Sequence, residues 1–415
     1  MLNITGKYST ARIYASIIDA ETERQIYEMV NSPLTEGASV AIMPDTHAGK
    51  GATIGTTIKL GAAPRVSPST VGVDIGCGML VCKFKIPSEW KDVNGKIKET
   101  VLASIDAAWR KVIPMGNNHR DTAHDFALSW KYFLRELKTP INIDEELKSM
   151  GTLGGGNHFG ELDIDTEGNG YFIIHSGSRH LGVEVAKYWQ GIANRTAAKK
   201  SNVRLNEGIA QLKKEGRTTE ISDFISNYKA ENPLPAEHLA YLEGDLLNGY
   251  LADMKIAQEY AKANRGLMMT LFLRELNLKV SDSFETVHNY ISFEDMTVRK
   301  GAISLNRDEV ALIPLNMRDG SLIVKGKGNI EWNCSGPHGA GRILSRAQAK
   351  ASVDINEFKN AMKNVYSTSV NESTLDESPM AYKDAEVIIS DIAETAKIVT
   401  RIVPVWNVKA GKNLI

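Results

Sequence analysis

Histidines in short polar or glycine-rich turns are the first residues of this sequence that could do chemistry. Five of the nine histidines have such a setting: His47, His158, His175, His288 and His338. Loops at the ends of strands are where ligand-binding side chains usually lie. A single histidine of this kind is ordinarily a structural turn residue, but five in similar settings favour a shared site.

A carboxylate and a thiol lie three residues apart in the segment VDIGCG, as Asp74 and Cys77. A turn at the intervening glycine can direct both side chains to one point. With the imidazoles of His158, His175 and His288 they would suit a divalent transition metal such as Mn, Fe, Co or Zn. The spacing alone equally allows Cys77 to be a small buried core residue, the commonest fate of a free cysteine.

Other segments have residues that could contact phosphate. The glycines of Gly154–His158 resemble a backbone nest, in which successive N–H groups approach an anion, although a plain turn has the same sequence. Arg179 follows His-Ser-Gly-Ser. Arg342 is the last residue of the motif HGAGR, and Arg346 comes four residues later. Arginine is a natural phosphate ligand, and the alternative for each of these residues is a surface ion pair.

His338 is followed by glycine at 339 and again at 341. We expect a helix to begin directly after it and to end in Arg346. The start of a helix disfavours an imidazolium, so this position would favour the neutral, nucleophilic form. The spacing equally allows His338 to be a metal ligand or a general base.

These residues must be positioned by both strands and helices. Apolar runs separated by glycine predict strands within 37–85, and similar patterns predict a strand at 170–178 and strands at 297–325. Apolar spacing predicts helices at 93–110 and 122–138. It also predicts helical character over about 183–275, with a solvated stretch at 200–220. The tail is predicted to contain a helix at 384–399 and a strand at 402–410. Strands at both ends of the chain favour one interleaved α+β domain over residues 1–415.

Composition restricts the class of protein. The 415 residues include 49 Lys+Arg and 50 Asp+Glu, a net charge of -1, which excludes a uniformly basic chain but leaves a local basic groove open. With 42% hydrophobic and 24% charged residues, wholesale disorder is excluded. Three cysteines exclude a disulfide scaffold. No apolar run of membrane-spanning length and no signal peptide is recognisable, so we expect a cytoplasmic protein without a membrane partner.

Taken together, the motifs resemble those of the RtcB family of RNA ligases. The resemblance extends from about residue 37 to 409 and rests on motifs in the family's order: MPDTHAGKGATIG, VGVDIGCGM, LGGGNHFGE, HSGSRHLG, HNY, RKGA, KGKGN, HGAGR and DESPMAYKDAEVI. It implies a single compact α+β domain with mixed sheets surrounded by helices.

The resemblance also implies a reaction. The family joins RNA ends bearing a 3′-phosphate or 2′,3′-cyclic phosphate to ends bearing a 5′-hydroxyl, with GTP and two Mn²⁺ ions. A histidine attacks the α-phosphorus of GTP, the guanylate passes to the RNA 3′-phosphate, and the 5′-hydroxyl displaces GMP. A cyclic end is first opened by metal-assisted hydrolysis. RNA repair and tRNA splicing are both expected roles, and an activating protein is a candidate partner.

Carried onto matching positions, the resemblance makes His338 the guanylated nucleophile and Cys77 a bridge between the two metals. It implies that His158 and His175 complete one metal site, and that Asp74 and His288 complete the other. Asp45, in the first motif, matches an acidic position near the site, and His47 is a weaker match.

The resemblance further implies a guanylate pocket and an RNA-binding set. The implied pocket residues are Asn157, Glu161, Ser321, Tyr382 and Lys409, together with Asn316. Glu161 would accept hydrogen bonds from the guanine base, and Tyr382 would contact it through its ring or hydroxyl. The implied phosphate ligands are Arg179, Arg342 and Arg346, with Lys300 and Lys327 as weaker candidates.

The chain departs from the family at three points. Pro314–Arg318 reads PLNMR where a Pro-Gly-Ser-Met-Gly turn is common, Pro337 directly precedes His338, and His180 replaces a glycine. The altered turn motivates a second hypothesis, a metal-dependent phosphoesterase that opens cyclic phosphates without GTP. A third hypothesis is a non-catalytic RNA-end-binding subunit, which the full set of ligands makes the weakest.

Overall fold

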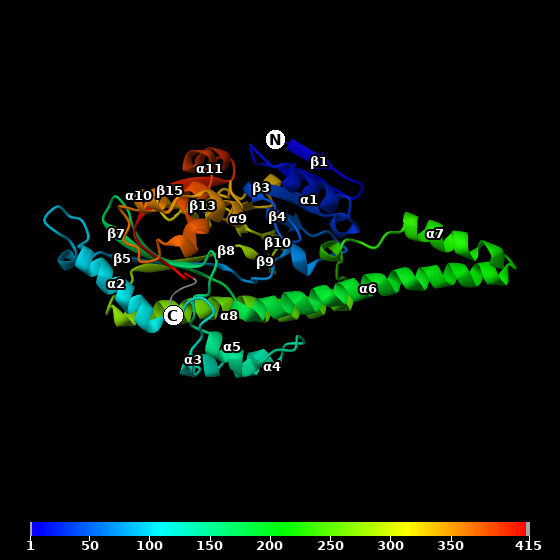
Figure 1. Ribbon diagram of the computed structural model, residues 1–415, viewed down its shortest axis with the longest axis horizontal. Helices are drawn as coiled ribbons and strands as arrows, with labels where there is room; N and C mark the ends of the chain where they lie inside the picture. Colours follow the sequence, from blue (N-terminus) through cyan, green and yellow to red (C-terminus); the bar gives the residue numbers. More distant parts are fainter. Residues whose placement is uncertain (1, 412–415) are drawn as a thin grey trace.

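A computed structural model gives the structure of residues 2–411. It is a compact α+β fold, in which two large sheets lie over a layer of long helices (Figure 1). The α+β class predicted from the sequence is therefore confirmed. No helix among the described residues is long and apolar enough to cross a membrane.

The first sheet contains the N-terminal strands. Its order is β1 (Leu2–Thr5), β2 (Thr10–Ile13), β3 (Ser39–His47), β4 (Ile54–Lys59), β10 (Thr297–Lys300) and β9 (Asn289–Ser292). Only the pairing of β2 with β3 is parallel among these. A small antiparallel pair, β11 (Ala302–Ser304) with β14 (Ser335–Pro337), leads directly into His338.

The second sheet is antiparallel and almost closes on itself. Its order is β12 (Val310–Asn316), β13 (Gly320–Gly326), β15 (Ala396–Lys409), β6 (Phe159–Ile164), β7 (Asn169–Ser176), β5 (Gly78–Lys85) and β8 (Asp282–Val287). The two edge strands approach each other where the amide of Leu312 donates to Oγ1 of Thr286 at 3.0 Å. Strand β15, from the end of the chain, lies between β13 and β6, so both ends of the sequence build one interleaved fold.

The middle of the chain forms three helices, of which α8 covers this sheet. They are α6 (Arg179–Lys214), α7 (Ile221–Glu231) and α8 (Gly244–Glu275). Helix α8 packs against β5 and β7 and against α6, and its buried residues include Met268 and Phe272. The distal half of α6 and α7 project from the body as an arm (Figure 1). Gly208 allows the Phe224 ring to lie against α6 there, since a Cβ would approach the ring to 2.2 Å.

Shorter helices complete the fold. They are α1 (Ala20–Val30), α2 (Glu99–Val112), α3 (Asp125–Leu128), α4 (Lys131–Arg135), α5 (Ile143–Ser149), α9 (Arg346–Ser352), α10 (Ile355–Ala361) and α11 (Ala385–Asp391). The ring centroids of Trp109 on α2 and Trp406 on β15 lie 5.5 Å apart, next to Phe272 of α8. These aromatic contacts bind a helix and a strand from opposite ends of the chain to α8.

The predicted strands correspond to observed strands, whereas two helix predictions were wrong in extent. The helix predicted at 122–138 is two short helices, because Oγ of Ser129 hydrogen-bonds to the carbonyl of Phe126 at 2.7 Å and competes with helical bonding. The helix predicted at 384–399 ends at Asp391. From Ala396 the chain pairs with β13 instead, so sheet formation overrides the helical pattern.

The prediction of a helix from His338 to Arg346 was also wrong. Residues 338–345 form turns, and Gly341 has a φ of 73°. Its α-carbon lies so close to the backbone of Asp45 that a Cβ would come within 2.6 Å. Helix α9 instead begins at Arg346, with a capping box between Ser345 and Gln348. His338 therefore lies beside a strand end and not at a helix N-terminus.

Candidate active site

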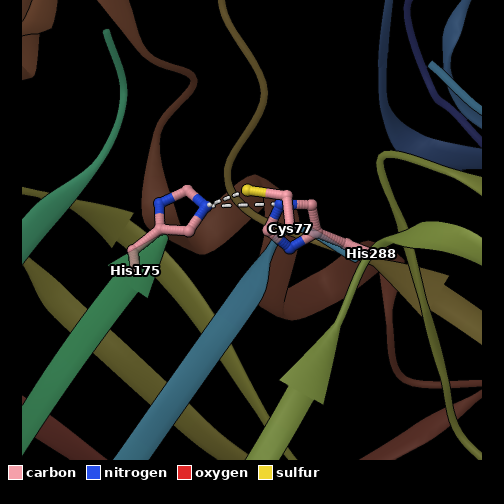
Figure 2. A group of neighbouring side chains, drawn as sticks. All are labelled: Cys77, His175 and His288. Carbon is pink, nitrogen blue, oxygen red and sulfur yellow. Dashed lines mark hydrogen bonds between the residues drawn. The ribbon is translucent and has the colours of Figure 1, made fainter. Parts of the chain in front are cut away.

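A thiol and two imidazoles meet where one strand of the second sheet begins and two others end. Cys77 directly precedes β5, His175 lies near the end of β7, and His288 directly follows β8 (Figure 2). Nε2 of His175 lies 3.3 Å from Sγ of Cys77 and 3.3 Å from Nε2 of His288. The backbone amide of His288 donates to the carbonyl of Cys77 at 2.9 Å, which fixes the strand ends against each other.

A second group extends the cluster on the other side of Cys77. Nε2 of His158 lies 3.4 Å from Sγ of Cys77 and 2.9 Å from Oδ2 of Asp74. Nδ1 of His158 lies 2.8 Å from the carbonyl oxygen of Leu153, which requires the proton on Nδ1. Nε2 then presents its lone pair to the cluster, as a metal ligand must.

Burial sets the protonation of these groups. Burial lowers the pKa of His175 and of His288 well below the usual value, and neighbouring imidazoles add to the effect. Burial, followed by the charge of Asp74, raises the pKa of the Cys77 thiol well above its usual value. Although burial also raises the pKa of Asp74, the interactions with His158, Cys77 and Arg179 together outweigh this effect, and the pKa is lowered.

The cluster fits a bound divalent cation. Cys77, His175 and His288 form one group, and Asp74, Cys77 and His158 form another, with the ligand atoms of each group within 4.8 Å of one another. Nδ1 of His175 and Nδ1 of His288 are buried and have no hydrogen-bond partner among residues 2–411. Hydrogen bonds at Nδ1 therefore do not explain the orientation of these two rings. Neutral imidazoles, a carboxylate and a thiol that a cation would deprotonate are the donors that transition metals prefer.

The grouping of these atoms differs from the one that the resemblance implies. Cys77 belongs to both groups, as a bridging ligand would. His158, however, lies against Asp74, and His175 lies against His288, whereas the resemblance pairs His158 with His175. Sγ of Cys77 is nevertheless 3.4 Å from Nε2 of His158 and 3.3 Å from Nε2 of His175, and the centroids of these two rings lie 5.3 Å apart.

His338 lies next to this cluster and is held by Asp45. Nδ1 of His338 is 2.6 Å from Oδ2 of Asp45, and the backbone amide of His338 donates to the same oxygen at 3.1 Å. Asp45 is fully buried in β3. The ring of His338 lies 5.0 Å from that of His288, between centroids. The carboxylate favours the tautomer with the proton on Nδ1, so Nε2 is the free, nucleophilic nitrogen.

A pocket opens over His338 and collects most of the residues implied for the nucleotide. His175 and His288 line it, whereas Asp45, Asp74, Cys77 and His158 do not. The other candidate residues that line it are His47, Asn157, Glu161, Asn316, His338, Arg342, Arg346, Tyr382 and Lys409. Two members of the metal cluster and the candidate nucleophile therefore line the same cavity as the predicted nucleotide ligands.

One wall of the pocket is built around a buried carboxylate, Glu377. Its oxygens contact Nζ of Lys409 at 2.9 Å, Nη1 of Arg346 at 2.5 Å and the hydroxyl of Tyr382 at 3.0 Å. Although burial raises its pKa, the charges of Lys409 and Arg346 lower it to about 2. Arg342 lies over the Tyr382 ring, 5.0 Å from its centroid. Glu377 thus orders four residues of this wall.

Glu161 also lines this pocket. Burial raises the pKa of Glu161 to about 7, and the hydrogen bond from Nδ2 of Asn407 at 2.5 Å opposes this rise. Asn407 and Lys409 both come from β15, which pairs with β6, the strand that bears Glu161. A carboxylate flanked by an amide and an ammonium can accept hydrogen bonds from a planar base.

Four of the candidate nucleotide and phosphate ligands lie outside the pocket lining. The guanidinium of Arg179 donates to Oγ1 of Thr152 and to the carbonyl of Gly116, at 2.9 and 2.8 Å. Ser321 is fully buried opposite Pro314 in the sheet. Nζ of Lys300 donates to the carbonyls of Lys50 and Ser69, both at 2.8 Å. The Lys327 ammonium donates to the carbonyl of Ala393 at 2.5 Å.

The turn that departs from the family has its own stabilising contacts. Oδ1 of Asn316 accepts hydrogen bonds from the amides of Arg318 and Asp319 at 3.0 and 2.9 Å. The residue with positive φ is Gly320, at 77°, so Arg318 avoids that conformation. Leu315 and Asn316 line the pocket at the positions where glycine and serine are common in the family, and Met317 matches the family's Met.

Sequence reasoning missed Glu377 and Asn407 as parts of this site. Glu377 lies in the motif DESPMAYKDAEVI, five residues before Tyr382, so the motif contained the signal. Asn407 lies two residues before Lys409 on β15, and alternate residues of a strand point to the same face. That periodicity would have assigned both side chains to the pocket.

Comparison with known proteins agrees with this geometry. Residues 25–410 match the family described as tRNA-splicing ligase RtcB. The RNA-splicing ligase RtcB of Escherichia coli strain K12 is 28% identical, and the alignment covers 92% of each chain. The tRNA-splicing ligases RtcB of Aeropyrum pernix and Pyrobaculum aerophilum are 26% and 27% identical, over 89% of this chain and 87% of theirs. The chain belongs to the RtcB family.

Proposed function

We propose that this protein is a GTP- and Mn²⁺-dependent RNA ligase with His338 as its nucleophile. It would join RNA 3′-phosphate or 2′,3′-cyclic phosphate ends to 5′-hydroxyl ends, in RNA repair or tRNA splicing. Membership of the family supports the broader function of an RNA ligase. The observation that supports the finer chemistry is the 2.6 Å contact of His338 with Asp45, beside a cluster of transition-metal ligands.

Asp74, Cys77, His158, His175 and His288 would hold the metal ions. Divalent cations bound there would polarise phosphate oxygens and stabilise the charge that develops during substitution at phosphorus. The mixed thiol, imidazole and carboxylate set does not select Mn²⁺ by its donor types alone. Mn²⁺ is part of the proposal because the motifs of the chain resemble those of a Mn²⁺-dependent family.

His338 performs the first chemical step of the proposal. Its Nε2 lone pair forms an N–P bond with the α-phosphorus of GTP, and the α–β P–O bond breaks to release pyrophosphate. The proton stays on Nδ1, where the Asp45 carboxylate balances the positive charge of the substituted ring. An oxygen of the RNA 3′-phosphate then attacks the same phosphorus and breaks the N–P bond.

The final step joins the RNA ends. The 5′-hydroxyl attacks the activated 3′-phosphorus, its proton passes to solvent, and GMP leaves. A cyclic phosphate is first opened by water to a 3′-phosphate. In this proposal Glu161 accepts from the guanine base, Tyr382 and Lys409 flank the nucleotide, and Asn157 and Asn316 contribute polar contacts from the pocket lining.

RNA binding would rely on a local set of cations, because the net charge of the chain is only -1. Arg342 and Arg346 line the pocket and are the leading candidates for RNA or nucleotide phosphates. The Arg179 guanidinium is hydrogen-bonded to the loop that bears His158, so we assign it to the support of that loop. An activating protein remains a candidate partner.

Intact-mass spectrometry after incubation with GTP and Mn²⁺ tests this function. We expect an adduct of the mass of GMP on the unsubstituted chain and none on His338→Ala. The His238→Ala variant is the matched control, because His238 lies outside the pocket and its Nε2 contacts only Glu28, at 3.9 Å, among the ion pairs of residues 2–411. An adduct of equal yield on His338→Ala would exclude His338 as the nucleophile.

The altered turn supports a second candidate function, a phosphoesterase that opens cyclic phosphates without GTP. Leu315 and Asn316 bring larger side chains to the pocket where the family commonly has Gly and Ser. If these side chains occlude the nucleotide, the metal cluster would still be available for hydrolysis. Cyclic-phosphate opening by metal-loaded protein without GTP, and no GMP adduct, would favour this function.

A further inference from the structure

Helix α8 places two buried polar side chains against the loops that bear the metal-site residues. Asn264 and Arg265 are both fully buried, and the next turn of the helix contains the apolar residues Leu267, Met268 and Met269. A buried amide and a buried guanidinium are costly unless every polar group finds a partner. Most of their partners are backbone atoms of the three segments that contribute Asp74, Cys77, His158 and His175.

Arg265 joins two of these segments. Its Nη1 donates to the carbonyl of Gly76, the residue before Cys77, and to the carbonyl of Ser176, the residue after His175, both at 2.7 Å. Its Nε donates to Oε1 of Glu285 at 2.7 Å, so the buried cation is paired. One nitrogen atom therefore fixes the separation of the two chain segments from which Cys77 and His175 project.

Asn264 joins the third segment to the second. Its Oδ1 accepts from the amides of Gly151 and Thr152 at 2.7 and 3.1 Å. Its Nδ2 donates to the carbonyls of Thr152 and Gly177 and to Oγ of Ser176, at 3.1 to 3.2 Å. The residues 151–152 begin the loop that ends in His158, so this amide ties that loop to the end of β7.

A short relay carries this fixation to the imidazole of His158. Oγ of Ser176, which accepts from Asn264, donates to the carbonyl of Leu153 at 2.8 Å. The same carbonyl accepts the Nδ1 proton of His158 at 2.8 Å. The orientation of the His158 ring, and the direction of its Nε2 lone pair, therefore depend on a carbonyl that is held through Ser176 by Asn264.

The contact of α8 with the Cys77 turn is also close in the backbone. Gly76 has a φ of 73°, and a Cβ there would lie 2.9 Å from Cβ of Ala261 and 3.0 Å from Cα of Gln258. Gly76 thus lets the turn rest directly on α8, one turn before Arg265. The turn that bears Cys77 therefore packs directly against the backbone of the helix.

We propose that Asn264 and Arg265 are positioning residues that set the spacing of Asp74, Cys77, His158 and His175, and thereby the affinity of the site for a divalent transition metal. This inference rests on the metal site of the proposed function. Ligands on three separate segments form a strong site only if their spacing is fixed before the ion binds. Groups that orient the ligands from behind typically change metal affinity by about 10- to 100-fold.

Titration of the full chain with Co²⁺ tests the proposal without any ligase assay. Affinity is measured by competition with a chelator of known affinity, and the thiolate-to-Co²⁺ absorption band reports the geometry at Cys77. We expect Arg265→Met to weaken Co²⁺ binding about 10- to 100-fold and to alter the band. Arg265→Lys should recover part of this loss, because an ammonium can also donate to two carbonyls.

Asp253→Asn is the matched control for a general loss of packing. Asp253 is also fully buried on α8, and it accepts from the amides of Lys138 and Thr139 and from Nε1 of Trp189, at 2.8 to 2.9 Å. None of these partners belongs to the metal segments. We expect this variant to lose thermal stability and to keep the Co²⁺ affinity of the unsubstituted chain.

A milder variant covers the case in which Arg265→Met does not fold. Asn264→Asp keeps the bonds from the amides of Gly151 and Thr152 but removes the donor to Ser176, and it should weaken Co²⁺ binding. If the Asn264 and Arg265 variants bind Co²⁺ as tightly as the unsubstituted chain, the positioning role of these two residues is overturned and the metal site is not. Equal weakening in Asp253→Asn would also overturn the positioning role. An unsubstituted chain that binds no Co²⁺ would overturn both the metal site and the positioning role.

Discussion

Oδ2 of Asp45 accepts two hydrogen bonds from His338, one from the ring at 2.6 Å and one from the backbone amide at 3.1 Å. Asp45 belongs to β3 of the first sheet, whereas His338 follows β14. The ring is therefore fixed in both tautomer and direction by a strand that lies almost 300 residues away in sequence.

We expect Asp45→Asn to slow the formation of the GMP adduct at least about 100-fold. The asparagine amide can donate to Nδ1 and would stabilise the opposite tautomer, which places the proton on Nε2. A time course of intact mass with GTP and Mn²⁺ measures the rate. An unchanged rate in a folded variant would mean that His338 does not depend on Asp45 for its tautomer.

We expect Cys77→Ala to lose most of the bound metal, because Cys77 belongs to both groups of ligands. The measurement is metal content per chain after dialysis against Mn²⁺ and desalting. Cys82→Ala is the control, since Cys82 is also a buried cysteine but lies within β5, in the core packed around Trp109. Similar metal loss in both variants would indicate a packing defect and not a lost ligand.

We expect GTP affinity to rise as the pH rises through about 7. Burial raises the pKa of Glu161 to about 7 from 4.5, so the carboxylate that would accept from guanine predominates only above that pH. Isothermal titration of GTP between pH 6 and 8 gives the profile, with the range chosen about that pKa. The Glu161→Gln variant should bind GTP more weakly and with a flat profile. A variant profile as steep as that of the unsubstituted chain would assign the titration to another group.

We expect Glu377→Gln to lower the free energy of unfolding by about 3 to 5 kcal/mol, because the buried ammonium of Lys409 would lose its counter-ion and the more exposed Arg346 would keep only its pairing with Asp376. A folded-state pKa of about 2 against 4.5 corresponds to roughly 3 kcal/mol. Since the folded pKa is the lower one, this stability is complete above pH 4.5 and is lost as the pH falls towards 2.

Urea unfolding at several pH values checks the Glu377 prediction. Glu386→Gln is the control, because Glu386 is an exposed carboxylate on the nearby α11 and should change stability by less than about 0.5 kcal/mol. A Glu377→Gln chain as stable as the unsubstituted chain at pH 7 would show that solvent, and not Glu377, balances these cations.

Local sequence was sufficient to propose the candidate metal ligands, which the structure brings together. Asp74 and Cys77 are joined by one turn, and each histidine stands at a strand end or in a glycine-rich loop, so their residue types and settings were visible in the chain itself. The pairing of His158 with Asp74, and of His175 with His288, depends instead on how three strands align side by side. Spacing along the chain holds no information about that alignment.

Supporting residues were harder to predict than ligands. Asn264 and Arg265 interrupt an apolar stretch of a helix, which indicates buried polar partners, but the identity of those partners depends on tertiary packing. The helix expected after His338 failed for the same kind of reason. The glycines that suggested a helix start instead allow Gly341 to approach the backbone of Asp45. Close approach of distant segments is the feature that a single sequence conceals.

The position of β15 in the second sheet has a consequence for biosynthesis. This strand is synthesised after every other described strand, yet it lies between β13 and β6 and carries Asn407 and Lys409 into the pocket. While the chain is still on the ribosome, both neighbouring strands have an unpaired edge, a state that promotes aggregation. A chain released early, for example from a broken message, would therefore lack a finished nucleotide pocket and would be a ready substrate for chaperones or proteases.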